Sequence, residues 1–405
     1  MKATSVVLCL VLLLVCAAQT NDSLNVRFVG SCDTPGDARG VAVTGSNVLV
    51  ANWDLGLRVI SVADPAHPIE VGHVDTPDTA VDVAALGSYA YVADWAAGLR
   101  VISVADPVHP IEVGSYDTPG YAYSVAVDSN YAYVTDADSG LWVISISDPT
   151  HPTMVGHLNV QSAFTTSVDG HFVYVNDCLY GGLRVITVVD PTAPAQVAYN
   201  DSIALVTRIA VNDDYVYVGS QDRGLFVVSV VDSTRPVEVG WCNTHDAVNG
   251  LAFDGYAYAV GYSKLYVISV SDPTDPDSVG YYHKPFWGAR SLAAAGDYIY
   301  VVGDSGLSVC QYYGAGIEEV ANAKRRVTKC EPTVVRGVLE LGVDRIQNAE
   351  YRAELLDATG RKALDLHPGA NDVSGLRPGV YFVRERSAAN GERPEVSVRK
   401  AIIGR

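Results

Sequence analysis

Short apolar runs separated by glycine and proline turns fill the chain from residue 33 to residue 313, and they return at a fixed interval. The leucine of the phrase GLRVISVADP marks this interval, because equivalent leucines are 42 residues apart in five steps and 40 apart in one. They are Leu57, Leu99, Leu141, Leu183, Leu225, Leu265 and Leu307. A constant period of about 40 to 50 residues made of short strands is typical of a radial array of small sheets.

One repeat, residues 75–116, shows how the pattern is built. Gly87-Ser88 is a turn of the kind that joins a hairpin, and the proline-rich stretch after Val104 is a rigid second turn because proline fixes φ. The apolar runs between the turns predict four strands, at 81–86, 89–94, 99–104 and 111–116. Each repeat is therefore expected to form a four-stranded antiparallel meander.

The third strand of the repeat is apolar at consecutive positions, so both of its faces must be covered. A single sheet cannot cover both faces, whereas sheets arranged around an axis press each blade between two neighbours. We therefore predict an all-β chain whose main domain, residues 25–313, is a seven-bladed β-propeller.

The two ends of the array predict how the ring closes. Residues 26–35 match the fourth strand of later repeats, since Asp33-Thr34-Pro35 lies 42 residues before Asp75-Thr76-Pro77. The last repeat stops after its third strand, at about Tyr313. We expect residues 26–33 to supply the missing strand and to remove an exposed sheet edge.

The repeat resembles a known family. GLRVISVADPAHPIEVG at residues 56–72, its near copy at 98–114 and GLWVISISDPTHPTMVG at 140–156 are similar to the LVIVD repeat of bacterial and archaeal surface proteins. The resemblance implies a propeller on a secreted or surface protein, and it brings no known catalytic apparatus. Later copies drift, as where Ser233 replaces the usual proline.

The C-terminal region has a different pattern. Residues 314–331 are polar and contain the basic cluster Lys324-Arg325-Arg326, which predicts a linker. From residue 332 to residue 405, short strands alternate with Asn, Gly and Pro turns, which predicts a small Ig-like β-sandwich.

Three phrases of this region, LLDATGRK, DVSGLRPGVYFVRE and VRKAIIGR, resemble the type A C-terminal sorting domain of the type IX secretion system. The resemblance implies export across the outer membrane of a Gram-negative bacterium, with the secretion machinery as a partner. The alternative is an adhesive sandwich without a sorting role. The residues that match the motif are Gly360, Arg361, Pro378, Gly379, Tyr381, Arg399 and Lys400.

The N-terminus and the charge agree with an exported protein. Residues 1–20 have a lysine, about ten apolar residues and small residues at the end, which is typical of a signal peptide and too short to span a bilayer. No transmembrane segment is expected elsewhere. Residues 1–313 carry 12 Lys and Arg against 33 Asp and Glu, within a net charge of −18. This argues against a nucleic-acid partner.

The loops between strands two and three vary while the strands stay constant, so we expect any ligand to bind there. Acidic and aromatic side chains recur in these loops, and they suit cations, basic protein surfaces or sugars that stack on tryptophan. The alternative is that Asp and Asn only hold the turns. The candidates are Asn52, Trp53, Asp54, Asp94, Trp95, Asp136, Asp138, Asp177, Tyr180 and Asp222.

Function is predicted to be non-catalytic binding of a protein or glycan by a monomer. We expect no catalytic residues, no metal and no cofactor, with Ca²⁺ as the ion to consider if the acidic residues converge. The competing hypothesis is an extracellular lyase or metal-assisted hydrolase that uses an acidic channel mouth. It needs several converging ligands of fixed type, and the equivalent positions vary from Asn52 to Gly303.

Overall fold

The computed structural model describes residues 23–314, except 161, 178–180, 204 and 284–287, and the strands of the C-terminal region that are named below. Residues 1–22, which hold the predicted signal peptide, and most of the predicted linker lie outside the described residues. Within the described part, no helix is long and apolar enough to cross a membrane.

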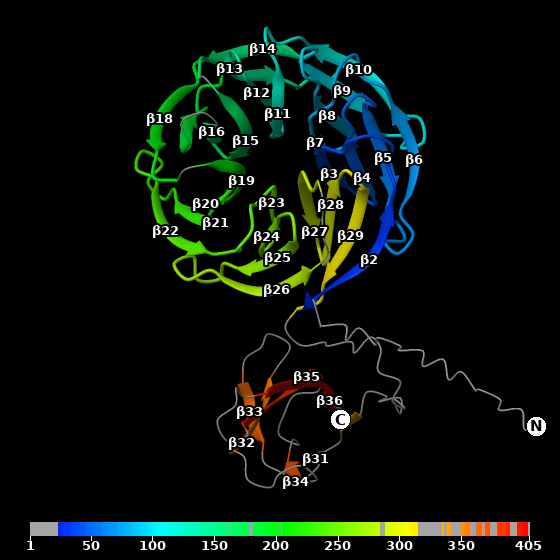
Figure 1. Cartoon of the computed structure of the whole chain (residues 1–405), viewed down its shortest axis with the longest axis vertical. Helices are drawn as coiled ribbons and strands as arrows, with labels where there is room; N and C mark the ends of the chain where they lie inside the picture. The colour runs from blue at the N-terminus through cyan, green and yellow to red at the C-terminus, as the bar shows by residue number, and fades with distance from the viewer. Residues whose placement is uncertain are drawn as a thin grey trace, which may run out of the picture.

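Seven small antiparallel sheets stand around one axis, which confirms the predicted seven-bladed propeller (Figure 1). The first four blades follow the chain in order. Blade 1 is β3 (Gly40–Thr44), β4 (Asn47–Ala51), β5 (Leu57–Ser61) and β6 (Ile69–Val74); blade 2 is β7 (Asp82–Leu86), β8 (Tyr89–Ala93), β9 (Leu99–Ser103) and β10 (Ile111–Tyr116). Blade 3 is β11 (Ala122–Val127), β12 (Tyr131–Asp136), β13 (Gly140–Ser145) and β14 (Thr153–Leu158); blade 4 is β15 (Ala163–Asp169), β16 (Phe172–Asp177), β17 (Leu183–Thr187) and β18 (Ala195–Asn200).

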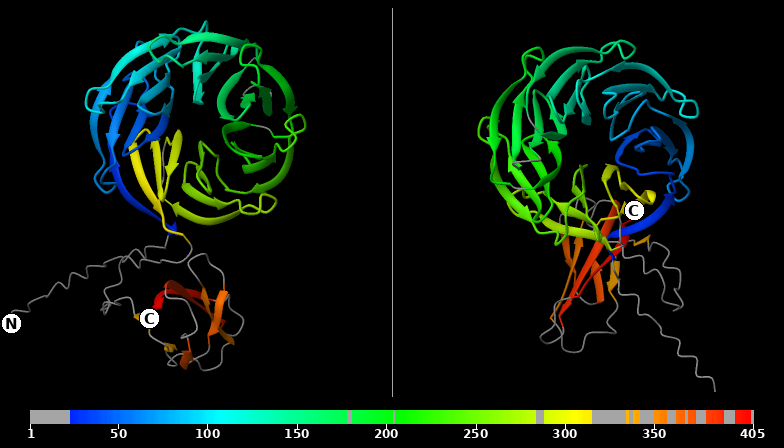
Figure 2. Two further views of the ribbon diagram at one scale, coloured as in Figure 1. Left: turned by 180° about the vertical axis from the view of Figure 1, so that it is seen from behind. Right: turned by 45° about the horizontal axis from the view of Figure 1, so that its top comes forward.

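The last three blades complete the ring, which Figure 2 shows from behind and tilted. Blade 5 is β19 (Val206–Asn212), β20 (Tyr215–Ser220), β21 (Gly224–Ser229) and β22 (Val237–Cys242). Blade 6 is β23 (Gly250–Phe253), β24 (Ala257–Val260), β25 (Lys264–Ser269) and β26 (Asp277–His283), with β1 (Ser23–Leu24) at its edge. Blade 7 is β27 (Ser291–Ala295), β28 (Tyr298–Gly303) and β29 (Gly306–Tyr312), with β2 (Val26–Cys32) as its fourth strand.

The core lies between neighbouring blades. The third strand shows why, because Leu57, Val59 and Ile60 of β5 have no exposed surface, as its apolar positions predict. Its side chains share one cluster with those of blade 2, where Leu49 and Val59 pack with Val83 and Val92. Each blade is thus covered on both faces, and the hydrophobic energy of the fold resides in the seams between blades.

In five of the seven blades, a glycine of the fourth strand receives the turn of the next blade. Gly72 lies at a register shift in β6, and a Cβ on it would meet the carbonyl oxygen of Pro107 at 2.3 Å. The same relation joins Gly114 to Pro149, at 2.4 Å. Only a residue without a side chain allows this approach, which explains why the repeat contains both a Val-Gly pair and an Asp-Pro turn.

Blades 6 and 7 depart from this rule because blade 7 has no Asp-Pro turn. The carbonyl oxygen of Leu24, in β1, lies beside Gly280 of blade 6 instead. β2 then pairs antiparallel with β29, from Val26 opposite Tyr312 to Cys32 opposite Leu307. In Figure 1 the blue strand β2 accordingly lies beside the yellow strand β29.

The described strands of the C-terminal region form two further sheets. One has five strands in the order β30-β36-β35-β32-β33, and the other pairs β31 with β34. Their bounds are β30 (Val334–Val335), β31 (Val338–Leu341), β32 (Glu350–Leu356), β33 (Lys362–Leu366), β34 (Gly369–Asp372), β35 (Gly379–Ala388) and β36 (Glu395–Ile403). The Ig-like sandwich and its sorting role stay predictions.

The sorting-motif residues fall partly within these strands. Gly379 and Tyr381 lie on β35, opposite Ile403 and Ala401 of β36. Arg399 and Lys400 lie on β36, opposite Val383 and Phe382. Gly360, Arg361 and Pro378 are outside the described residues.

Candidate functional site

Four of the predicted site residues are buried where the second strand of a blade ends, instead of facing a ligand. Asn52, Asp94 and Asp177 have no exposed surface, and neither has Asp136. Asp94 accepts hydrogen bonds from the Thr76 hydroxyl at 2.6 Å and from the backbone N–H of Asp78 at 3.1 Å. Burial raises the pKa of Asp94, although both hydrogen bonds lower it.

Asp136 shows the same role in blade 3. Its carboxylate accepts the backbone N–H groups of Gly120 at 2.8 Å and of Asp138 and Ser139 at 3.0 Å. These buried oxygens hold the blade-to-blade connection against the loop between strands two and three, as Asx-type bonds do. The structure therefore places Asp94 and Asp136 in turn-holding positions, and the buried carboxylate of Asp177 pairs with the Arg184 guanidinium. The expected acidic mouth of the channel stays a prediction.

The other acidic candidates lie apart from one another on the surface. Asp54, Asp138 and Asp222 are exposed, and Asp222 accepts the Ser220 hydroxyl at 2.8 Å. Tyr180 is outside the described residues. Among the residues that the structure describes, no three His, Cys, Asp or Glu side chains are grouped as metal ligands would be.

The two tryptophans do come together, within a row of rings that we call the aromatic arc. Trp53 and Trp95 have ring centroids 6.2 Å apart, although they belong to blades 1 and 2. The row continues from Trp95 to Tyr121 at 4.8 Å and to Tyr123 at 5.5 Å, and from Tyr123 to Phe164 at 4.3 Å. Four blades thus contribute to one aromatic surface, on which Tyr121 is 41% exposed.

The backbone fixes both tryptophans in an unusual conformation. Trp53 has φ of 48° and Trp95 has φ of 45°, in the left-handed region that bulky residues rarely adopt. Trp53 forms an antiparallel bridge to Ala80, just before β7, and Trp95 forms one to Ala122, the first residue of β11, so each is tied to the next blade. Strain of this kind costs about 1–3 kcal/mol and persists where surrounding contacts over-determine it.

The arc leads into a cavity of about 340 Å³ at the mouth of the central channel. The guanidinium of Arg39 stacks over Trp53 at 3.9 Å, and Arg39, Tyr123 and Phe164 also line the cavity. One equivalent position from every blade faces it, spaced by 42 residues except for a last step of 41. These positions, the upper ring, are Arg39, Val81, Tyr123, Thr165, Thr207, Asn249 and Arg290.

The next residue of each blade forms a second level, around a smaller cavity of about 170 Å³. This lower ring is Gly40, Asp82, Ser124, Thr166, Arg208, Gly250 and Ser291, and all of its members except the two glycines line the cavity. Its carboxylate, Asp82, accepts the Ser124 hydroxyl at 2.6 Å and the backbone N–H groups of Val83 and Val125 at 2.9 and 3.2 Å. Burial raises the pKa of Asp82, and these hydrogen bonds and the charge of Arg208 oppose that rise.

Arginine, hydroxyl, amide and aromatic groups therefore line the upper cavity, and the neighbouring carboxylates of Asp37 and Asp82 are already bound by Arg39 and Ser124. Arg39, Arg208 and Arg290 face the cavity, although residues 1–313 contain only 12 Lys and Arg. Sequence reasoning missed them because the residue type at this position differs from blade to blade. Their shared place in the 42-residue period was the available signal, since this period puts them at one level of the ring.

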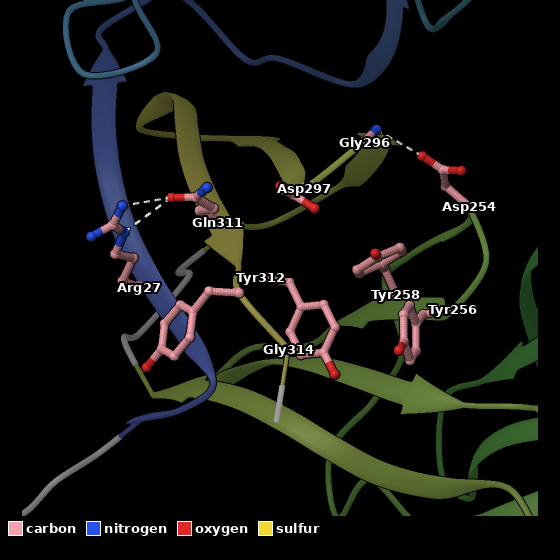
Figure 3. Close-up of a pocket in the computed structure, with 10 residues that line it drawn as sticks. Arg27, Asp254, Tyr256, Tyr258, Gly296, Asp297, Gln311, Tyr312 and Gly314 are labelled. Atoms are coloured by element: carbon pink, nitrogen blue, oxygen red, sulfur yellow. Dashed lines mark hydrogen bonds between the residues drawn. The ribbon is translucent and has the colours of Figure 1, made fainter. Parts of the chain in front are cut away.

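A larger hollow, of about 670 Å³, lies between blades 6 and 7 on the opposite face (Figure 3). It lies beside the end of β29, where the other blades continue into an Asp-Pro turn. Tyr256 packs edge-on against Tyr312 at 4.9 Å, and burial raises the pKa of Tyr258 to about 12. Arg27 pairs with Gln311. The hollow thus lies where the turn of blade 7 is missing, and Leu24 and Tyr312 lie beside Gly280 there.

Comparison with known families agrees with this architecture. The LVIVD repeat matches six segments that together cover more than half of the chain: residues 35–76, 78–118, 119–160, 205–244, 251–284 and 288–310. The chain belongs to the LVIVD repeat family. The segment that forms blade 4 lies outside these matches and nevertheless forms a four-stranded sheet.

Solved propellers share the fold at low sequence identity. The WD40 repeats of RRP9 match with a TM-score of 0.58 at 13% identity, over 70% of this chain and 96% of that one. Sqt1 of Saccharomyces cerevisiae matches at 0.55 and 11%, over 70% and 98%, and the computationally designed Ika8 protein at 0.55 and 11%, over 71% and 99%. At such identity they show the fold alone. No curated protein sequence matches the chain.

Proposed function

We propose that this protein is an exported, non-catalytic binding propeller whose ligand lies across the aromatic arc. The observation that carries the proposal is the continuous row of five rings from four blades, which ends at a cavity lined by all seven. Aromatic faces at 4 to 6 Å spacing provide a wide, rigid contact surface at low entropic cost.

A glycan is the ligand class that this surface suits best. The C–H faces of pyranose rings stack on tryptophan and tyrosine, and their hydroxyl groups need the donors and acceptors that Thr165, Thr207 and Asn249 offer at the cavity. The left-handed backbone at Trp53 and Trp95 supports a ligand-binding role, because strain of this kind clusters at functional sites. No bound metal or cofactor is needed for such contacts.

Binding of a panel of immobilised glycans by the labelled full chain tests this proposal. Retention of any glycan that depends on Trp53 or Trp95 supports it, and a chain that retains none contradicts it. The competing enzyme hypothesis needs carboxylates that converge at the mouth, and the turn hydrogen bonds of Asp94 and Asp136 favour the binding role over it.

We propose further that residues 1–20 direct export and that residues 332–405 form an Ig-like sorting domain. The protein would then reach the medium or the outer surface of a Gram-negative cell through the secretion machinery that reads this domain. Fusion of residues 315–405 to an inert periplasmic reporter tests the idea in a host with type IX secretion. Export of the fusion supports it, and retention in the periplasm contradicts it.

A further inference from the structure

The geometry points to an acid-binding site at the channel mouth, where the uronic acid unit of an acidic glycan places its carboxylate among Arg39, Arg208 and Arg290. The glycan class rests on the proposed function above. The preference for a negative charge is independent of the proposed function, because this preference comes from the channel residues and not from the aromatic arc.

The arginines converge from blades that are far apart in sequence. Arg208 extends from blade 5 and donates to the carbonyl oxygens of Thr207 at 2.9 Å and of Arg290 at 2.8 Å. Burial lowers the pKa of Arg208, and the nearby charges of Arg290 and Arg39 lower it too, while Asp82 opposes this. A guanidinium has five N–H donors, and these two carbonyl contacts occupy only part of that fork.

Asp37 holds the other two arginines together at the rim. Its carboxylate lies 2.7 Å from the Arg39 guanidinium and 3.4 Å from that of Arg290. Asp304 is a further acidic neighbour of Arg290, at 3.6 Å. With Asp82 already hydrogen-bonded to Ser124, the three arginines present a site that an incoming carboxylate can enter.

Two threonine hydroxyls are the independent sign of a ligand. Thr165 and Thr166 are each only 9% exposed, and their Oγ1 atoms have no hydrogen-bond partner. Thr165 lines the upper cavity and Thr166 the lower one. Buried polar groups are nearly always hydrogen-bonded in folded proteins, so these two hydroxyls beside a cavity are groups that a rotation of the side chain toward a polar ligand would satisfy.

The ligand must therefore combine an anion, hydroxyl groups and a ring face. The upper cavity of about 340 Å³ is of the size that small ligands occupy. Tyr123 and Phe164 offer ring faces at its wall, and they are also the inner end of the aromatic arc. A hexuronate meets all three requirements, whereas a neutral sugar brings no carboxylate to the arginines and a polyglutamate brings no ring face to Tyr123 and Phe164.

Calorimetric titration of the full chain with galacturonate, trigalacturonate, galactose and triglutamate tests the inference. We expect galacturonate to bind at least about tenfold more tightly than galactose, because hydrogen bonds to charged groups are the stronger ones. Arg290→Gln should weaken galacturonate binding at least about tenfold. Arg235→Gln, which removes an exposed arginine on the outer turn of blade 5, is the matched control and should leave it unchanged.

A second variant distinguishes a loss of binding from a loss of the fold. Thr165→Val removes an unpartnered hydroxyl from the cavity, so it should weaken galacturonate binding without lowering the melting temperature. Equal affinity for galactose and galacturonate, tighter binding of triglutamate than of trigalacturonate, or no effect of Arg290→Gln would each overturn the site. A neutral glycan bound through Trp95 with no preference for carboxylate would overturn it and leave the proposed function standing.

Discussion

The carbonyl oxygen of Pro107 approaches Gly72 so closely that a Cβ on the glycine would lie 2.3 Å from it. The two residues belong to neighbouring blades, and the contact recurs around the outer rim. Blade 4 has Ala198 at the glycine position, and the following turn has Ser233 at the proline position. The two departures occur at the same seam, which indicates that the glycine and the turn are coupled.

Gly72→Ala is expected to destabilise the propeller. The new methyl group must displace the backbone of the second blade's turn, and overpacking of this kind costs about 1–3 kcal/mol. Urea denaturation followed by circular dichroism measures the loss as a lower midpoint at unchanged slope. Ala198→Gly, at the equivalent position of blade 4, is the control, and it should lose less. Equal losses in the two variants would show that the glycine contact is not specific.

Deletion of residues 25–34 should open the ring. It removes β2 and leaves β29 with an unpaired edge, and exposed edges of this kind invite aggregation. We expect a lower and broader thermal transition with aggregation in light scattering. A chain that begins at Ser23 serves as the control. A deletion variant that melts like this control would show that the N-terminal strand does not close the ring.

Acid should weaken the fold through the turns between strands three and four. The Thr192 hydroxyl lowers the pKa of Asp190, and Thr234 and Thr274 do the same for Asp232 and Asp272. The unfolded carboxyl, with a pKa of about 3.9, therefore binds a proton more readily than the folded one. The stabilisation is present above that pH and is lost as the pH falls through the lower folded pKa.

The triple variant with asparagine at residues 190, 232 and 272 isolates this effect. Asparagine keeps the acceptor oxygen of each turn but does not titrate, so the loss of stability below about pH 4 should be shallower than in the parent. Asp82 and Asp94 act in the opposite sense, because burial raises their pKa values, and they are the same in both chains. Identical urea midpoints from pH 3 to pH 5 would refute the assignment.

The fold could be predicted from the sequence because one interval carries several independent signals. The consecutive apolar positions around Val59 require cover on both faces, and the seven copies supply it. The same 42-residue interval predicts that the strand at Val26, at the start of the chain, is the fourth strand of the last blade. The period could not reveal that Leu24 takes the place of the missing turn beside Gly280, since these residues share no motif with it.

The site was predictable only in part. Trp53 and Trp95 were found because they lie in variable loops between constant strands. Asp94 was misplaced because an aspartate after a strand has the same sequence pattern whether it faces solvent or bonds the Thr76 hydroxyl. The convergence of Arg39 with Arg208 depends on the closed ring, which brings residues 169 positions apart to one cavity.

Binding of glycans by Trp95→Ala tests the central claim most directly. On a glycan array, the full chain should retain at least one glycan. Trp95→Ala should bind that glycan at least about tenfold more weakly, since a tryptophan covered by a ligand contributes strongly to binding. Trp241→Ala, which removes a 44% exposed tryptophan from the outer strand of blade 5, should bind like the parent. Unchanged binding by Trp95→Ala, or equal losses in the two variants, would contradict the aromatic arc as the ligand site.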